Sequence, residues 1–269
     1  MNKKTLTTKK KAFSLIELSI VLIIIGLLVA GVTGGASLIK NAELRGVMSE
    51  ARGYQTAVNG FFERFQALPG DYTKVIGTAS GSGIGNGDGS INYVNSITAT
   101  YVSPSVSRAE SNGAWQHLKN GGFVTDAFTA ATTDITGVTG SGALVAGSPG
   151  INLPASKNKG GSWIFDYIGT QNVIIISAGI PAILTGASAA ITANSLIASA
   201  TSSTSAGNMQ IMPADALSID TKTDDGVANA GKVTALGGAG ASLCSSTATY
   251  TTGNGYKACA LAFQIDPNS

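Results

Sequence analysis

The sequence predicts an α+β fold in which one long N-terminal helix packs on a mainly antiparallel β-sheet. Two features predict the helix. Leu18 to Ile39 is a run of 22 residues without charge, and apolar residues then recur at spacings of three and four up to Phe65. The helix should therefore have a transmembrane half and an amphipathic half. Short runs rich in β-branched and aromatic residues, separated by turn residues, lie after residue 160 and predict the sheet.

Charge and composition narrow the possible functions. Charged residues make up 12% of the 269 residues, roughly half of the usual ~25%. Five of the 17 Lys and Arg residues lie in the first eleven positions, and without them the formal net charge of +2 becomes −3. Because basic charge is concentrated at the N-terminus, nucleic-acid binding is not expected. One histidine and two cysteines are too few for a four-ligand structural zinc site.

The uncharged run could anchor the chain in a membrane. As a helix, Leu18–Ile39 would be about 33 Å long, enough to cross a bilayer core of ~30 Å. The lysines before it predict a cytoplasmic N-terminus, with the chain after residue 40 outside. The alternative is a secretory signal peptide cleaved near Thr33–Ser37. Glu17 is unusual for such a peptide, because a carboxylate at the edge of an apolar span is costly without a partner.

The segment KAFSLIELSIVLIIIGLL, residues 11–28, resembles the class III signal of type IV prepilins and type II secretion pseudopilins. In this family a basic leader ends in a small residue, usually Gly, and the mature chain begins F-[ST]-L-I-E-L. The resemblance implies that prepilin peptidase cleaves between Ala12 and Phe13, that Phe13 is N-methylated, and that Glu17 acts in filament assembly. Ala12 in place of Gly is the one departure from the pattern.

The position of Glu17 suits such a role. Its Cα would lie roughly 6 Å along the helix from Phe13. In a helical filament, the α-ammonium of a neighbouring subunit can reach a carboxylate at that depth. Pairing removes the cost of two isolated charges in hydrocarbon, so we expect it to set the register of the subunits rather than to add much net stability.

The chain divides into four parts by sequence: a basic leader (1–12), a transmembrane and filament-core helix (13–40), its amphipathic continuation (41–68), and a periplasmic or extracellular pilin-like globular domain (69–269). The helix should end at residues 68–71 (LPGD), because Pro69 and Gly70 break helices. In the globular domain the sequence predicts helices at 111–124, 186–199 and 212–226, and strands at 163–168, 172–177, 232–236 and 259–265.

Acidic residues offer weak candidates for calcium binding. Asp88 lies in a glycine-rich segment, and Asp224 and Asp225 follow the last predicted helix. Some secretion pseudopilins bind calcium near their C-terminal sheets, and the resemblance extends this reading to Asp220. No register supplies a complete calcium loop, so roles in turns and at a helix end are favoured, and no cofactor is expected.

Cys244 and Cys259 are expected to form a disulfide, because two cysteines in an oxidising exterior usually pair. The two cysteines are 15 residues apart, and closing a loop of this length would stabilise the fold by roughly 3 kcal/mol on an entropic estimate. The pair also resembles the C-terminal disulfide-bounded loop of many type IV pilins. Two buried free thiols are the alternative.

The resemblance implies a structural subunit of a type IV filament, and not an enzyme. His117 has no neighbours in sequence that suggest a catalytic dyad, and it is expected to be an exposed or hydrogen-bonded helix residue. The implied partners are prepilin peptidase, which is also the N-methyltransferase, the inner-membrane assembly platform with its ATPase, and other pilins or pseudopilins, including further copies of this chain. The subunit would cross the bacterial inner membrane once and then enter a periplasmic or cell-surface filament.

The sequence leaves several alternatives open. The filament could be a pilus, a secretion pseudopilus or a DNA-uptake fibre, and the chain could be a major or a minor subunit. An inner-membrane-anchored surface adhesin that does not polymerise is the alternative function. A periplasmic enzyme released by signal peptidase would instead have its mature N-terminus near residue 37.

Overall fold

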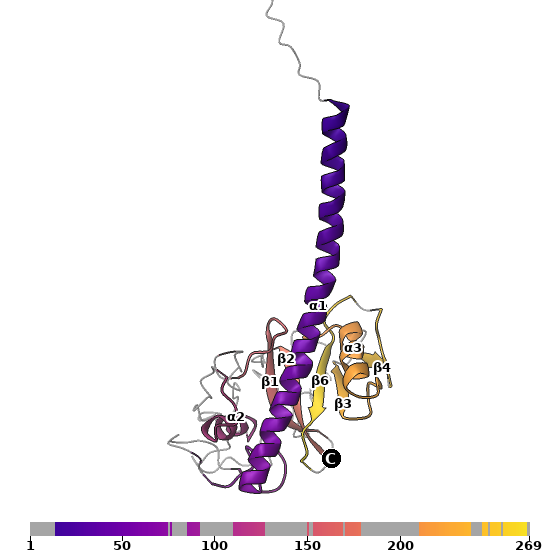
Figure 1. The fold of residues 1–269 in the computed structure, drawn as a ribbon. Coiled ribbons are helices and arrows are strands. Elements are labelled where there is room, and N and C mark those ends of the chain that lie inside the picture. The colour runs from indigo at the N-terminus through magenta and orange to yellow at the C-terminus, as the bar shows by residue number, and fades with distance from the viewer. Residues whose placement is uncertain are drawn as a thin grey trace, which may run out of the picture. The chain divides into compact units, whose positions relative to one another are not determined.

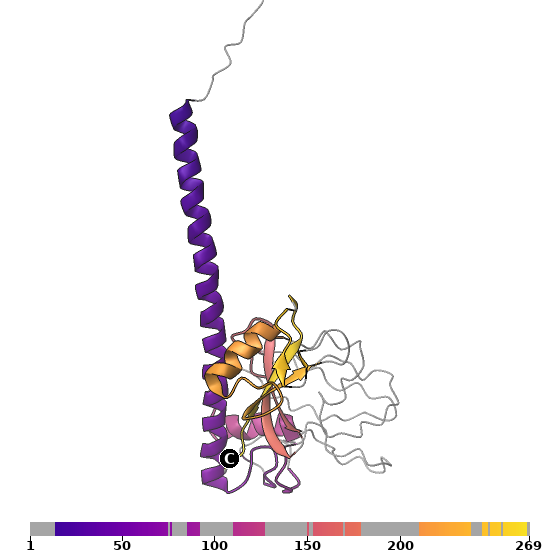
Figure 2. The same cartoon turned by 90° about the vertical axis from the view of Figure 1, so that its right-hand side faces the viewer.

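The computed structural model describes residues 14–74, 76, 85–91, 110–126, 150, 153–168, 170–178, 210–237, 244–246, 248–253 and 255–267. The leader, Phe13 and the helix expected at 186–199 lie outside the described residues. The chain forms two compact units, Met1–Glu43 and Leu44–Ser269. Figure 1 and Figure 2 show their elements from two directions.

Helix α1 spans Leu15–Phe65 and confirms the long N-terminal helix. In the first unit its apolar side chains are exposed on every side, with Leu15 at 87% and Leu27 at 70% exposure. This part is long and apolar enough to cross a membrane. A helix that is apolar all round needs lipid or protein around it, because water solvates it poorly.

In the second unit α1 becomes amphipathic, as predicted. Its buried residues follow one stripe: Leu44, Val47, Ala51, Tyr54, Ala57, Val58 and Phe61. The helix ends at Phe65 because Gln66 turns into the left-handed region, at φ 53°, and Pro69 follows. The Gln66 Nε2 also donates to the carbonyls of Phe62 and Glu63, at the helix end where carbonyls run out of intrahelical partners, and the Phe62 carbonyl accepts the Gln66 amide as well.

The sheet has four strands in the order β1–β2–β6–β3, and all three pairings are antiparallel. The strands are β1 (Gly161–Ile168), β2 (Gln171–Ala178), β3 (Val233–Gly237) and β6 (Cys259–Gln264). A separate two-stranded ribbon pairs β4 (Ser245–Ser246) with β5 (Thr249–Tyr250). The four strands predicted from the sequence are therefore confirmed, together with the α+β class.

Two shorter helices complete the described elements. Helix α2 (Glu110–Asn120) is closed by Gly121 and by Gly122, which has a φ of +78° that favours glycine. Helix α3 (Pro213–Thr223) begins with proline in its first turn, where the missing amide costs nothing. Both agree with the helices expected near these positions.

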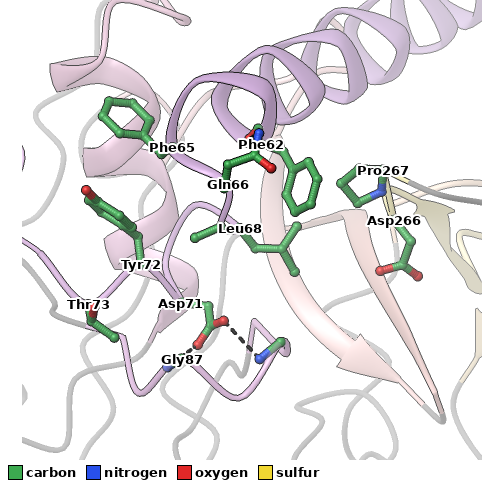
Figure 3. Close-up of a pocket in the computed structure, with 12 residues that line it drawn as sticks. Phe62, Phe65, Gln66, Leu68, Asp71, Tyr72, Thr73, Gly87, Asp266 and Pro267 are labelled. Carbon is green, nitrogen blue, oxygen red and sulfur yellow. Dashed lines mark hydrogen bonds between the residues drawn. The ribbon is translucent and has the colours of Figure 1, made fainter.

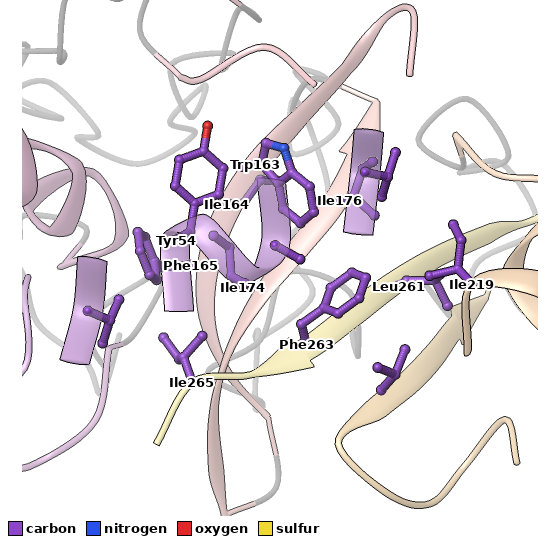
Figure 4. Close-up of a cluster of buried hydrophobic side chains, with 14 of the residues drawn as sticks. Tyr54, Trp163, Ile164, Phe165, Ile174, Ile176, Ile219, Leu261, Phe263 and Ile265 are labelled. Atoms are coloured by element: carbon purple, nitrogen blue, oxygen red, sulfur yellow. The ribbon is translucent and has the colours of Figure 1, made fainter. Parts of the chain in front are cut away.

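The core lies between α1 and one face of the sheet (Figure 4). Trp163 is fully buried there, and its ring centroid lies 5.6 Å from that of Tyr54 on α1 and 5.8 Å from that of Phe263 on β6. Val173 and Ile175 point to the opposite face, where they form a second buried cluster with Ala260 and Ala262. Buried side chains on both faces explain why these strands read as continuous apolar runs.

Candidate functional site at the start of the long helix

The first turn of α1 places a carboxylate at the edge of the apolar span. Leu15 is the first helical residue, so Ser14 is the N-cap and Glu17 the third residue of the helix. The Ser14 amide donates to Glu17 Oε2 at 2.9 Å. This is the glutamate half of a capping box, and it satisfies one amide that has no partner within the helix. A negative charge at this position also interacts favourably with the positive end of the helix dipole.

The surroundings of Glu17 are apolar. Ile16 and Leu18 flank it, with exposures of 65% and 58%, and the residues of the following turns are equally exposed. Among the described residues, no lysine or arginine side chain forms an ion pair with Glu17. In a bilayer, a carboxylate with one backbone partner is incompletely satisfied, so a cation from outside the described chain would be bound favourably.

Residues 7–33 match the family model of the prokaryotic N-terminal methylation motif. This N-terminus is a prepilin-type signal. It is the class III signal of type IV pilins and pseudopilins, and the match spans both Ala12 and Phe13, which lie outside the described residues. No curated protein and no solved structure significantly matches the chain. The roles of Ala12, Phe13 and Glu17 within the prepilin-type signal stay predictions.

The globular unit behind the prepilin-type signal holds one buried histidine. His117 on α2 is 0% exposed, stacks on Phe61 with a centroid distance of 5.8 Å, and accepts a hydrogen bond from the Gly70 amide at Nδ1, at 2.9 Å. The histidine is thus hydrogen-bonded, one of the two expected states, and it is not exposed. Burial lowers the pKa of His117 from 6.5 to about 4, so the imidazole is neutral near pH 7.

Acid is therefore expected to destabilise the folded globular unit through His117. In the unfolded chain the His117 imidazole takes up a proton near pH 6.5, whereas in the folded chain it does so only near pH 4. The stability that His117 contributes is complete above pH 6.5 and falls by at most ~1.4 kcal/mol per pH unit as the pH drops, for a total of about 3 kcal/mol. Urea unfolding of the mature chain in detergent, measured at intervals from pH 7 to pH 5, checks this.

His117→Asn is the matched variant for that measurement, because its side-chain oxygen can still accept the Gly70 amide but does not titrate. The difference in stability between the natural chain and this variant isolates the histidine, which is the only one in the sequence. If that difference is constant between pH 7 and pH 5, the neutral buried imidazole is wrong.

The loop after α1 is closed by an aspartate that the sequence analysis did not single out. Asp71 is buried, its Oδ1 accepts the amides of Gly87 and Asp88 at 2.6 and 3.0 Å, and its Oδ2 accepts the Gly89 amide at 2.9 Å. Three consecutive amides around one carboxylate form an anion-binding nest, and the anion that it binds is the Asp71 side chain. Gly87 and Gly89, with φ of +78° and +85°, permit this turn.

Asp88, a weak calcium candidate, makes its own turn within this loop. Its Oδ1 accepts the Ser90 amide and hydroxyl at 2.9 and 2.5 Å, and its Oδ2 accepts the Asn86 side-chain amide at 2.7 Å. Burial tends to raise the pKa of Asp88, but these hydrogen bonds outweigh it and hold the pKa below its ordinary value. The contacts support the turn role that the sequence favoured.

A hollow of about 540 Å³ lies beside this loop, where α1 ends (Figure 3). Phe62, Phe65 and Tyr72 supply aromatic surface, and Asp71 and Asp266 supply carboxylates. Asp266 accepts hydrogen bonds from the main chain and side chain of Asn172, and Asp71 holds its loop. Both acids therefore have structural roles, and the described lining residues do not form a nucleophile–base pair.

Asp220, Asp224 and Asp225 come together at the end of α3, with one carboxylate oxygen of each within 4.8 Å of the others. Asp220 is buried and accepts the Tyr250 hydroxyl at 2.8 Å. Burial, and then the charges of Asp225 and Asp224, raise the pKa of Asp220. Three carboxylates this close could together bind a divalent cation.

The two later acids of this cluster also act in turns. Asp224 Oδ2 accepts the amides of Lys232 and Val233, and Asp225 Oδ1 accepts the Val227 amide at 2.8 Å. These contacts agree with the turn and helix-end roles that the sequence favoured. Calcium binding by the cluster stays the untested alternative that the sequence did not favour.

The expected disulfide is present between Cys244 and Cys259, whose Cα atoms are 4.8 Å apart. It joins the residue before β4 to the first residue of β6. The ribbon β4–β5 is thereby fixed to the sheet, and Tyr250 of β5 reaches Asp220 on α3. The bridge closes the loop between Cys244 and Cys259 and so limits the conformations that the unfolded chain can adopt.

Glu50 is a second residue whose role the sequence analysis missed. Its Oε2 accepts the Ser156 hydroxyl at 2.9 Å, the Lys157 amide at 3.1 Å and the Trp163 indole N–H at 3.2 Å. It thus joins α1 to the sheet and to the loop before β1. Its position, three residues after Val47 and four before Tyr54, places it beside the buried stripe and was a usable signal.

Proposed function

We propose that this chain is a structural subunit of a type IV filament, either a type IV pilus or a type II secretion pseudopilus. The observation that carries the proposal is the prepilin-type signal, which marks the chain as a substrate of prepilin peptidase. The cut between Ala12 and Phe13 would remove the basic leader. The mature chain would then begin four residues before Glu17.

The fold supports this proposal in two ways. The first part of α1 exposes apolar side chains on all sides, which suits both a bilayer and a bundle of identical helices. The globular unit buries the second part of α1 against a disulfide-bridged sheet, so a rigid head is attached to the proposed assembly helix. A carboxylate lies within the first turn of that helix.

In this proposal the chain is inserted in the inner membrane with its globular unit in the periplasm, and an assembly platform with its ATPase drives polymerisation. Partners include further copies of the chain and other pilins or pseudopilins. We propose no resident cofactor and no catalytic role, and we assign Asp88, Asp224 and Asp225 to turns.

The mature N-terminus tests the proposal. When the chain is produced with prepilin peptidase, N-terminal sequencing and intact mass should show a chain that begins with singly methylated Phe13. Ala12→Gly should be processed at least as completely, because Gly is the usual residue of the signal, and Ala12→Leu should leave the leader attached. A mature chain that begins near residue 37 would instead identify a secretory signal peptide.

A further inference from the structure

A narrow polar stripe runs along the exposed side of α1 in the globular unit. Six exposed residues recur at alternating spacings of four and three: Arg45, Ser49, Arg52, Thr56, Asn59 and Glu63. At 3.6 residues per turn these positions fall within about 80° of helix circumference. They lie opposite the buried stripe of α1, which packs in the core. We call these residues the α1 stripe.

The charges of the α1 stripe have opposite signs at its two ends. Arg45 and Arg52 lie toward the N-terminal end and Glu63 toward the C-terminal end. Among the described residues, none of these three side chains forms an ion pair or a hydrogen bond, whereas the nearby Arg64 lies over the Phe65 ring. The stripe therefore carries separated charges that no side chain in the described part of the protein neutralises.

Short side chains occupy the positions between those charges. Ser49 and Thr56 belong to the stripe, and the adjoining Gly53 is exposed with no atom within 4 Å of where a Cβ would lie. Small residues allow the backbones of two helices to approach closely. The stripe thus combines a shallow surface with charge at both ends.

We propose that the α1 stripe docks on the α1 stripe of a second copy of this chain, with Arg52 of one copy paired to Glu63 of the other. This inference rests on the filament proposed above, in which all copies point the same way. Parallel helices without axial displacement would bring Arg45 and Arg52 against themselves. A displacement of about 16 Å, which is 11 residues at ~1.5 Å each, brings Arg52 beside Glu63.

The same displacement avoids other like-charge contacts within the stripe. It places Arg45 of the displaced copy beside Thr56 of its neighbour, which can accept a hydrogen bond. One exposed ion pair contributes only about 0.2–1 kcal/mol, so its role is to select the stagger between subunits rather than to hold them together. Repetition along a filament multiplies that selection.

Charge reversal in the full chain tests the pairing. Arg52→Glu places two acids opposite each other and should lower the yield of sheared filaments at least tenfold, and Glu63→Arg should do the same. The double variant restores opposite charges and should recover at least half of the natural yield. Lys222→Glu reverses the charge of an exposed residue on α3 in the same way, and it should leave the yield unchanged.

A second measurement reports the contact without relying on yield. In a chain carrying Arg52→Cys and Glu63→Cys, the new cysteines are about 16 Å apart along one helix and cannot bridge within it, because a disulfide needs Cα atoms within roughly 7 Å. Mild oxidation of filaments should therefore produce covalent dimers and longer ladders. Either single cysteine variant should give none of these ladders.

The outcomes separate the two proposals. If the natural chain forms filaments but Arg52→Glu does not reduce them, or the double variant does not recover, the docking of the α1 stripe is wrong and the filament role stands. Absence of covalent dimers in intact filaments also overturns the docking. If the natural chain carries methylated Phe13 but never polymerises, both the filament role and the docking fail.

Discussion

Replacing Glu17 with alanine is expected to leave the chain in the membrane and to lower filament yield at least tenfold. The change removes a charge from the start of an apolar helix, so insertion itself becomes no harder. In the proposed filament, however, the Glu17 carboxylate lies beside the α-ammonium of a neighbouring Phe13. N-methylation keeps that ammonium charged, so the alanine variant leaves an unpaired cation in an apolar surrounding.

The size of this effect follows from the asymmetry of buried ion pairs. Removing one partner of such a pair costs about 3–5 kcal/mol, because the other charge stays desolvated and unpaired. Each subunit added to a growing filament would incur this cost. The loss of the hydrogen bond between Glu17 and the Ser14 amide is minor by comparison, because it frays only the first turn.

Two variants distinguish the charge from the size of the side chain. Glu17→Gln keeps the length and an acceptor for the Ser14 amide but removes the charge, so it should fail nearly as completely as alanine. Ser19→Ala removes a hydroxyl that bonds the Ile16 carbonyl in the same turn, and it should assemble normally. Membrane fractions and sheared filaments, each quantified by immunoblot, provide the readout. Normal filament yield from Glu17→Ala would sink the pairing.

The backbone of this protein could largely be predicted from its sequence, because its signals are local. The apolar run and the amphipathic stripe define α1, and Pro69 and Gly70 place its end within a few residues of Phe65. Strands β2 and β6 were recognisable because both of their faces are buried, so their central residues are continuously apolar. Turn glycines marked the end of α2 for the same local reason.

Long-range contacts of single polar side chains could not be predicted in this way. Asp71 was read only as part of a helix-ending turn, yet its carboxylate closes a loop 16 to 18 residues further along the chain. His117 meets Gly70 across 47 residues, and a pattern of nearby residues carries no information about that pairing. Such contacts depend on tertiary packing, which the helical and strand periodicities do not encode.

Glu50 shows the same limit within a helix whose position was predicted correctly. The sequence placed it among the polar residues between apolar positions, but it is half-buried and accepts the indole of Trp163, 113 residues later. A buried carboxylate must be hydrogen-bonded, and three donors from the sheet and its preceding loop satisfy it. The helix face was therefore predictable, whereas its polar contact was not.

Trp163, which donates this hydrogen bond to Glu50, is the site of the second large effect that we expect, a loss of stability. Trp163→Ala should destabilise the globular unit by about 3–5 kcal/mol, because it replaces a fully buried indole with a cavity between α1 and the sheet. The ring contacts with Tyr54 and Phe263 would be lost together. Domains of this size are usually stable by only about 5–15 kcal/mol, so the variant would lose a large part of its stability.

Trp163→Phe separates packing from the hydrogen bond to Glu50. It keeps most of the ring but loses the indole N–H, and a hydrogen bond to a charged group is worth about 1.5–3 kcal/mol. Since Glu50 retains Ser156 and Lys157 as donors, we expect a loss at the lower end of that range. Urea unfolding of the mature chain in detergent, followed by the fluorescence of the remaining Trp115, measures both variants.

If Trp163→Phe is as damaging as Trp163→Ala, the hydrogen bond to Glu50 and not the packing holds α1 on the sheet. If Trp163→Ala costs less than about 1 kcal/mol, the site collapses around the missing ring and neither contact is decisive. We expect Trp163→Ala to lose much more stability than Trp163→Phe. That result would show that the aromatic packing around Trp163 holds α1 on the sheet. In the proposed filament that attachment transmits every pull on the head to the helix that holds the subunits together.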